Sequence, residues 1–177
     1  MKYLVMCEGP NEKAVMDILL EHHLLKFNEN DLLGLVTYHA RQITTSAQVR
    51  TALNLYPGTI RVLRIGDKQS DVLRIPPAYR AKISDIEKFC TKPELEMLLI
   101  LAEGLEKEYA KVKSKTRAKS FAKENVTTGG RKYDNSTAFY RLYFENRPDL
   151  LVRALRRYHQ TNGSHAKDEH YLDELLL

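Results

Sequence analysis

The stretch MKYLVMCEGPNE, residues 1–12, decides the fold. Its apolar run, residues 3–6, is bounded by turn residues, which is typical of a buried central strand in a parallel sheet. Gly9 and Pro10 then reverse the chain, and Pro10 suits the first turn of a helix. Glu8 is therefore expected at the carboxyl end of a strand, which is the edge where open α/β sheets bind ligands.

Strand and helix patterns alternate along the first hundred residues. The expected strands after the first are residues 32–38, 59–65 and 82–90, and the expected helices are residues 11–25, 46–55 and 91–112. Because the connections are short, this order favours a parallel sheet with right-handed crossovers. We therefore expect an α/β fold over residues 1–105, in which a Rossmann-like parallel sheet of about four strands is flanked by helices.

The segment TKPE, residues 91–94, resembles a helix start. Thr91 is the expected N-cap, Pro93 lies in the first turn, and Glu94 would complete a capping box. The leucine-rich run that follows is the most apolar helix pattern in the chain.

Residues 106–177 have a different character and are expected to form a basic helical extension packed on the α/β part. Helices are expected over residues 136–144, 148–159 and 168–177. Basic residues at every second position would share one side of an extended arm. With two later basic residues, the candidate nucleic-acid contacts are Lys111, Lys113, Lys115, Arg117, Lys119, Arg131 and Lys132. The alternative is a solvated basic surface without a ligand.

Acidic residues follow the first and third strands. Glu8 comes after the first strand and Asp67 after the third, and these two strands are commonly neighbours in a doubly wound sheet. Converging carboxylates repel one another unless a cation lies between them, and oxygen ligands of this kind suit Mg²⁺ or Mn²⁺. The sequence thus predicts a metal site formed by Glu8 and Asp67. The alternative is that the short EGxxE pattern follows the strand by chance. Glu12 is expected to be a first-turn helix acid, which the helix dipole favours, and not a ligand.

These residues resemble a known family. EGPNE after the first strand, with Asp67 after the third, is similar to the Toprim domain of topoisomerases, primases and OLD-type nucleases. KPELEMLLIL, residues 92–101, resembles the matching segment of the small RloB-like branch. The resemblance covers residues 2–101. It implies a Toprim-like sheet, a role for Glu8 as general acid or base, Asp67 as a metal ligand, and Glu96 as a later catalytic acid.

One position departs from the family pattern. The second aspartate of the family's Asp-x-Asp pair falls on Gln69, so Asp71 is the candidate substitute. The resemblance implies a Mg²⁺-dependent nuclease, or a related phosphoryl-transfer enzyme, acting on DNA or RNA, with a role in antiviral host defence. Gln69 favours the alternative, a non-catalytic Toprim-fold binding module or an accessory subunit of a larger ATPase or nuclease assembly.

Composition limits the environment and the partners. The 177 residues carry a formal net charge of +5, which permits nucleic acid as a partner but does not require it. Cys7 and Cys90 lie far apart, so neither a disulfide framework nor a zinc motif is expected. With no apolar run of membrane-spanning length, we expect a cytoplasmic protein without membrane contact. An ATPase partner and a homo-oligomer are both left open.

Overall fold

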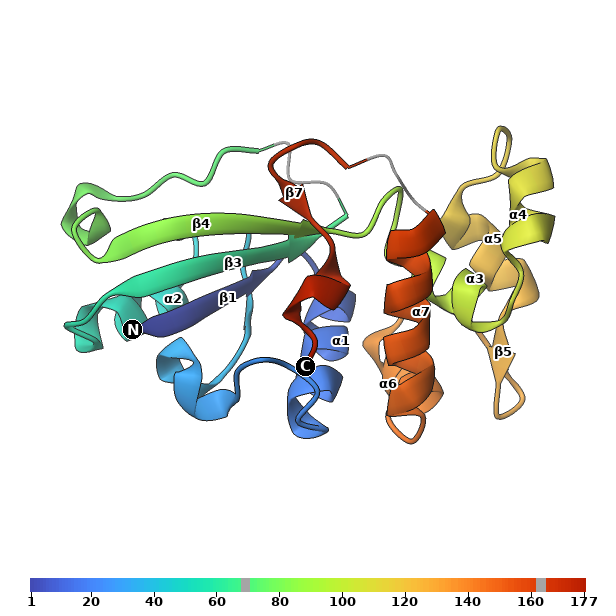
Figure 1. The fold of residues 1–177 in the computed structure, drawn as a ribbon, viewed down its shortest axis with the longest axis horizontal. Coiled ribbons are helices and arrows are strands. Elements are labelled where there is room, and N and C mark those ends of the chain that lie inside the picture. Colours follow the sequence, from blue (N-terminus) through green and yellow to red (C-terminus); the bar gives the residue numbers. More distant parts are fainter. Residues whose placement is uncertain (68–70, 162–164) are drawn as a thin grey trace.

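The computed structural model describes residues 1–67, 71–161 and 165–177. Within these ranges, five strands form one sheet, and every neighbouring pair runs parallel (Figure 1). The strand order is β2-β1-β3-β4-β7, with β1 (Lys2–Cys7), β2 (Tyr38–His39), β3 (Ile60–Gly66), β4 (Ile83–Cys90) and β7 (Glu169–His170). The fold is therefore α/β with a parallel sheet flanked by helices, as the alternating pattern predicts.

Helices and turns cover both faces of the sheet. The central strands are therefore apolar at consecutive positions, because side chains on either face are buried. Val5 and Leu63 face one cluster of the core, and Leu4 and Val62 face the other. The first cluster is covered by α1 (Pro10–Glu21) and by the final 3-10 turn (Leu172–Leu175), and the second by α2 (Ala47–Leu55) and the turn at Pro77–Tyr79.

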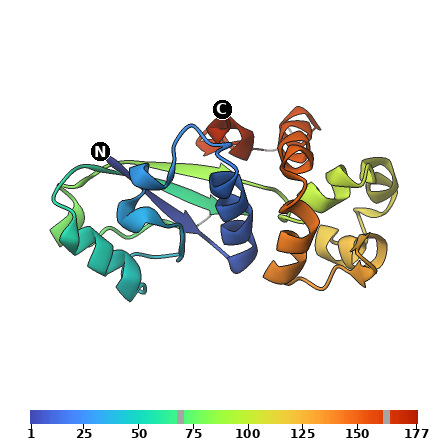
Figure 2. The same cartoon turned by 90° about the horizontal axis from the view of Figure 1, so that it is seen from below.

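A helical part lies beyond the carboxyl ends of the strands (Figures 1 and 2). It consists of α3 (Met97–Ala102), α4 (Glu106–Val112), α5 (Ala118–Asn125), the hairpin β5–β6 (Thr127–Thr128 and Arg131–Lys132), α6 (Thr137–Phe144) and α7 (Pro148–Thr161). The helical part therefore begins at Met97, before residue 106. One continuous apolar cluster joins it to α1 and the sheet. None of the helices in the described ranges has the length and apolar character needed to cross a membrane.

The predicted strand at residues 32–38 is wrong. One short 3-10 turn, Leu33–Leu35, lies in this segment and follows another at Glu29–Asp31. Pairing with β1 is confined to an isolated bridge between Leu32 and Tyr3 and to the short strand β2, Tyr38–His39. Gly34 and Leu35 have φ angles of 71° and 63°, which is incompatible with extended backbone. The apolar run signals burial only in part. Leu33 is buried under α2, whereas Leu35 and Val36 are exposed.

The predicted helix over residues 91–112, with its capping box, is also wrong in its start and its continuity. A cis peptide bond precedes Pro93, and α3 begins only at Met97. The Glu94 carboxylate accepts a hydrogen bond from the backbone N–H of Lys119 at 2.9 Å and pairs with Arg117, so it holds the start of α5 instead. Gly104, with φ of 70°, separates α3 from α4.

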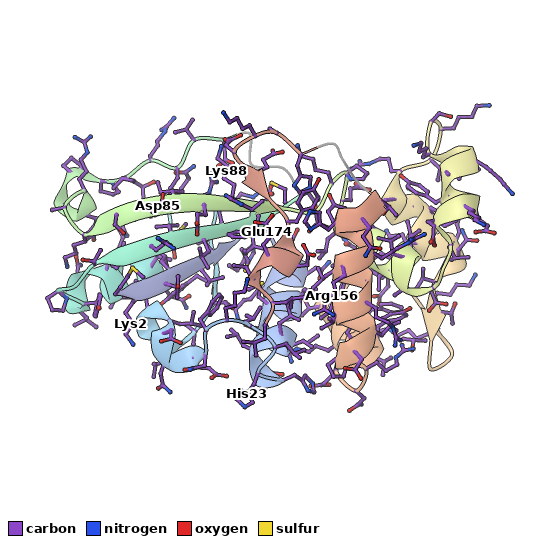
Figure 3. All side chains as sticks on the ribbon, in the orientation of Figure 1. Lys2, His23, Asp85, Lys88, Arg156 and Glu174 are labelled. Carbon is purple, nitrogen blue, oxygen red and sulfur yellow. The ribbon has the colours of Figure 1, made fainter. Side chains whose placement is uncertain are left out.

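The terminal segment is not a helix. Residues 169–170 form β7 at the edge of the sheet, and a short 3-10 turn follows. Lys88 on β4 lies beside β7 (Figure 3), and its Nζ pairs with Asp168 at 2.9 Å. A pairing between residues eighty positions apart has no local signature in the sequence. By contrast, α6 and α7 match the predicted helices closely, and Ser136 caps α6 by accepting a hydrogen bond from the Phe139 N–H.

Candidate functional site

Glu8 and Asp67 lie together at the ends of adjacent strands. β1 and β3 pair along their whole length, with Cys7 opposite Ile65, and the Glu8 N–H donates to the Ile65 carbonyl at 2.8 Å. Both acids line one crevice of about 220 Å³ at the carboxyl edge of the sheet, which we call the acidic crevice. Its charged lining residues are Glu8, Glu12, Arg41, Asp67, Glu96 and Lys119.

Two carboxylate oxygens in the acidic crevice lack a partner. Glu8 Oε2 and Asp67 Oδ1 are buried and have no hydrogen-bond donor among the described residues. The other oxygen of Glu8, Oε1, pairs with Arg41 Nη2 at 3.1 Å, and Asp67 accepts a hydrogen bond from the Leu95 N–H. A buried acceptor without a donor is costly, so these two atoms fit a cation.

The carboxylates of the acidic crevice disfavour one another's ionised forms. Burial, followed by the charges of Glu12, Glu96 and Glu8, raises the pKa of Asp67 from 3.8 to about 8. Burial also raises the pKa of Glu12, with smaller contributions from Glu8 and Glu96. At neutral pH the crevice therefore holds a proton on Asp67 when no cation is bound, because burial and repulsion both disfavour its charged form.

Glu96 enters the crevice from the start of α3 and is almost fully buried, with 3% of its surface exposed. Its Oε1 accepts a hydrogen bond from the Tyr133 hydroxyl at 2.6 Å. Lys119 Nζ on α5 lies 3.7 Å from the same oxygen. Tyr133 and Lys119, both in the helical part, thus contact the glutamate to which the Toprim resemblance would give a catalytic role.

Asp71 does not line the acidic crevice. Its two carboxylate oxygens accept hydrogen bonds from Arg64 Nη2 at 3.0 and 2.9 Å, and Gln42 donates to one of them. Arg64 is buried, with 3% of its surface exposed, and its Nη1 also donates to the Asp71 carbonyl. Asp71 is therefore the counter-ion of a buried arginine on β3. Gln69, at the departure from the family pattern, lies outside the described residues.

The predicted nucleic-acid contacts do not form an extended arm. Lys111 lies in α4 and Lys119 in α5, and Lys119 alone of the set lines the crevice. Arg117 pairs with Glu94, and Arg131 pairs with Asp134 at 2.5 Å. The other members of the set, all exposed, are Lys111, Lys113, Lys115 and Lys132.

Sequence reasoning missed three residues of the site. Glu12 was expected to be a helix-start acid, but its carboxylate lies in the crevice beneath Gly9, where an added Cβ would meet Glu12 Oε2 at 2.6 Å. Arg41 lies two residues beyond the end of β2, so a strand-end rule widened to the following loop could have found it. Tyr133 carried no signal, because its contact with Glu96 spans 37 residues.

The acids share a crevice without already converging on one point. No group of three or more His, Cys, Asp or Glu side chains that could hold a metal ion occurs in the described part of the chain. Both cysteines are free and buried. Comparison with known proteins gives no match to a family model, a curated protein or a solved structure.

Proposed function

We propose that this protein is a divalent-cation-dependent phosphoryl-transfer enzyme of the Toprim type, a nuclease acting on DNA or RNA. The observation that carries the proposal is the pair of unpartnered carboxylate oxygens, Glu8 Oε2 and Asp67 Oδ1, in one crevice at the carboxyl ends of adjacent parallel strands. A role in host defence, in the cytoplasm, remains part of this proposal and rests on resemblance alone.

Glu8 and Asp67 would hold Mg²⁺ or Mn²⁺, with Glu12 and Glu96 completing the negative lining. A bound cation would polarise a phosphate ester and lower the pKa of an attacking water. Glu8 would take a proton from the nucleophile or give one to the leaving group, since it is one of the less buried acids of the crevice. Asp67 must lose its own proton before it can bind the ion.

The cations of the crevice support a phosphate-containing substrate. Lys119, with a side chain 38% exposed, and Arg41, with a side chain 67% exposed, flank the acids and can reach a phosphate oxygen. The exposed lysines of α4 and the following turn would contact the nucleic-acid backbone farther away, without reading its sequence.

A cleavage assay tests the proposal. Mixed DNA and RNA substrates, single- and double-stranded, are incubated with Mg²⁺ or Mn²⁺ and either the natural chain or Asp67→Ala. Cleavage by the natural chain that needs the cation and is lost in the variant is expected. Asp71→Asn is a matched control outside the crevice and should retain cleavage. Equal activity with Asp67→Ala would reject the proposal.

A second function, a non-catalytic binding module or an accessory subunit beside an ATPase, is favoured by a different observation. Arg41 and Lys119 already neutralise part of the charge of Glu8 and Glu96, and Asp71 is engaged by Arg64. Titration with Mn²⁺ discriminates between the two functions. An enzyme of the proposed type binds the ion in the micromolar to millimolar range, whereas absence of binding favours the module.

A further inference from the structure

Tyr133 stands out among the buried polar groups that the proposed chemistry does not use. It is 2% exposed, follows the β5–β6 hairpin, and points its hydroxyl at Glu96 Oε1 at 2.6 Å. Its ring packs edge-on against Phe139 and Tyr140, with ring centroids 5.2 and 5.8 Å apart. The aromatic packing fixes the ring, and the fixed ring fixes the direction of the hydroxyl.

We propose that Tyr133 is a positioning residue that holds Oε1 of the Glu96 carboxylate, so that Oε2 is left to join Glu8 and Asp67 when a cation binds in the acidic crevice. This inference rests on the proposed function. Tyr133 and Lys119 both approach Oε1, which leaves Oε2 of Glu96 as the oxygen that can turn to the ion. The Tyr133 hydroxyl also lies 3.1 Å from Asn135 Oδ1, but it carries one proton, and its shorter contact is the one with Glu96. A phenol that donates this proton to Oε1 orients the carboxylate without competing with the cation for its other oxygen.

The path of the chain explains why a residue so distant in sequence takes this role. Glu94 binds the N–H of Lys119 and thereby places the start of α5 beside the crevice. The hairpin then returns the chain, and the Tyr133 N–H donates to the Val126 carbonyl at 3.0 Å. The helical part thus delivers both the lysine and the tyrosine to a single carboxylate oxygen.

The chain offers a matched control for the hydroxyl. Tyr140 is also fully buried in the same aromatic cluster, but its hydroxyl makes no hydrogen bond to Glu96 and interacts with the Tyr133 hydroxyl. Tyr133→Phe and Tyr140→Phe each remove one buried oxygen from neighbouring rings. Only the first removes a contact with Glu96, so a difference between them reports on that contact and not on packing.

The test is Mn²⁺ affinity, measured by calorimetry on the 177-residue chain without substrate. Loss of an outer partner of a metal ligand typically weakens binding tenfold to a hundredfold, so Tyr133→Phe should bind about tenfold more weakly and Tyr140→Phe within about twofold of the natural chain. Glu96→Gln should also bind weakly. Adding Tyr133→Phe to Glu96→Gln should then cause little further loss, because the tyrosine acts through the glutamate.

Three results are distinguishable. Unchanged affinity in Tyr133→Phe, or full additivity with Glu96→Gln, overturns the positioning role while the proposed function stands. Absence of Mn²⁺ binding by the natural chain overturns the proposed function and this inference together. Far-UV circular dichroism and thermal unfolding verify that each variant is folded before its affinity is compared.

Discussion

The substitution Asp67→Asn tests whether the acidic crevice stores unfavourable electrostatic free energy when no cation is bound. Burial and the neighbouring carboxylates raise the pKa of Asp67 from 3.8 to about 8. Each pKa unit corresponds to about 1.4 kcal/mol, so ionising this side chain in the folded chain costs at most about 5 to 6 kcal/mol more than in the unfolded chain. Relaxation and water entry lower that limit, and we expect about 3 kcal/mol.

The sign of the pH dependence follows from the protons that each state binds. Between about pH 4 and pH 8 the folded chain keeps a proton on Asp67 that the unfolded chain has lost, so the free energy of unfolding falls as pH rises. Above about pH 8 both states are ionised and the penalty is complete. Asparagine carries no charge, so the variant should match the natural chain near pH 4 and exceed its free energy of unfolding by about 3 kcal/mol near pH 9.

Urea unfolding with a chelator present, followed by circular dichroism from pH 4 to pH 9, measures this difference. Asp71→Asn is the matched control. Although partial burial acts in the opposite direction, hydrogen bonds from Arg64 lower the pKa of Asp71, so this variant should be less stable than the natural chain at neutral pH. Identical pH dependence in the natural chain and Asp67→Asn would refute the reasoning.

Further substitutions probe other contacts. Asp71→Ala leaves buried Arg64 without its carboxylate and should lower the free energy of unfolding by about 2 kcal/mol, measured in urea. Arg64→Met should cost less, because it removes the buried charge and leaves Asp71, whose side chain is 49% exposed, to be solvated by water. Gly9→Ala should displace the Glu12 carboxylate and weaken Mn²⁺ binding with little change in Tm, since φ of −135° suits alanine. Ser46→Ala removes the cap of α2 and should cost about 1 kcal/mol in the same urea assay.

The central strands, and the position of Glu8 and Asp67 at the same edge of the sheet, could be predicted from sequence because each depends on local rules. An apolar run between turn residues indicates a buried strand, and the end of a strand identifies the residue at the sheet edge. No such rule predicts the left-handed backbone at Leu35, because a leucine gives the same apolar signal in a turn as in a strand. The helix start at residues 91–94 failed because Glu94 satisfies a distant backbone N–H and not its own helix.

The boundary predicted at residue 105 marks a change in surface charge along the sequence. It does not divide the main apolar cluster, which contains residues from both sides of it. The helices beyond residue 105 look separate because their exposed faces carry lysine, yet the buried side chains of α6 and α7 belong to the same apolar cluster as the sheet. Tyr109 of α4 and Phe121 of α5 pack in a smaller cluster with Ile100 of α3. The acidic crevice, like the core, is built from both parts of the chain. The sheet contributes Glu8 and Asp67, while the orientation of Glu96 depends on Tyr133 and Lys119 beyond residue 105. A chain cut at that point would lose the partners of Glu96 as well as the buried apolar side chains of α5, α6 and α7. The helical part is therefore a structural wall of the crevice, in addition to any surface it offers to nucleic acid.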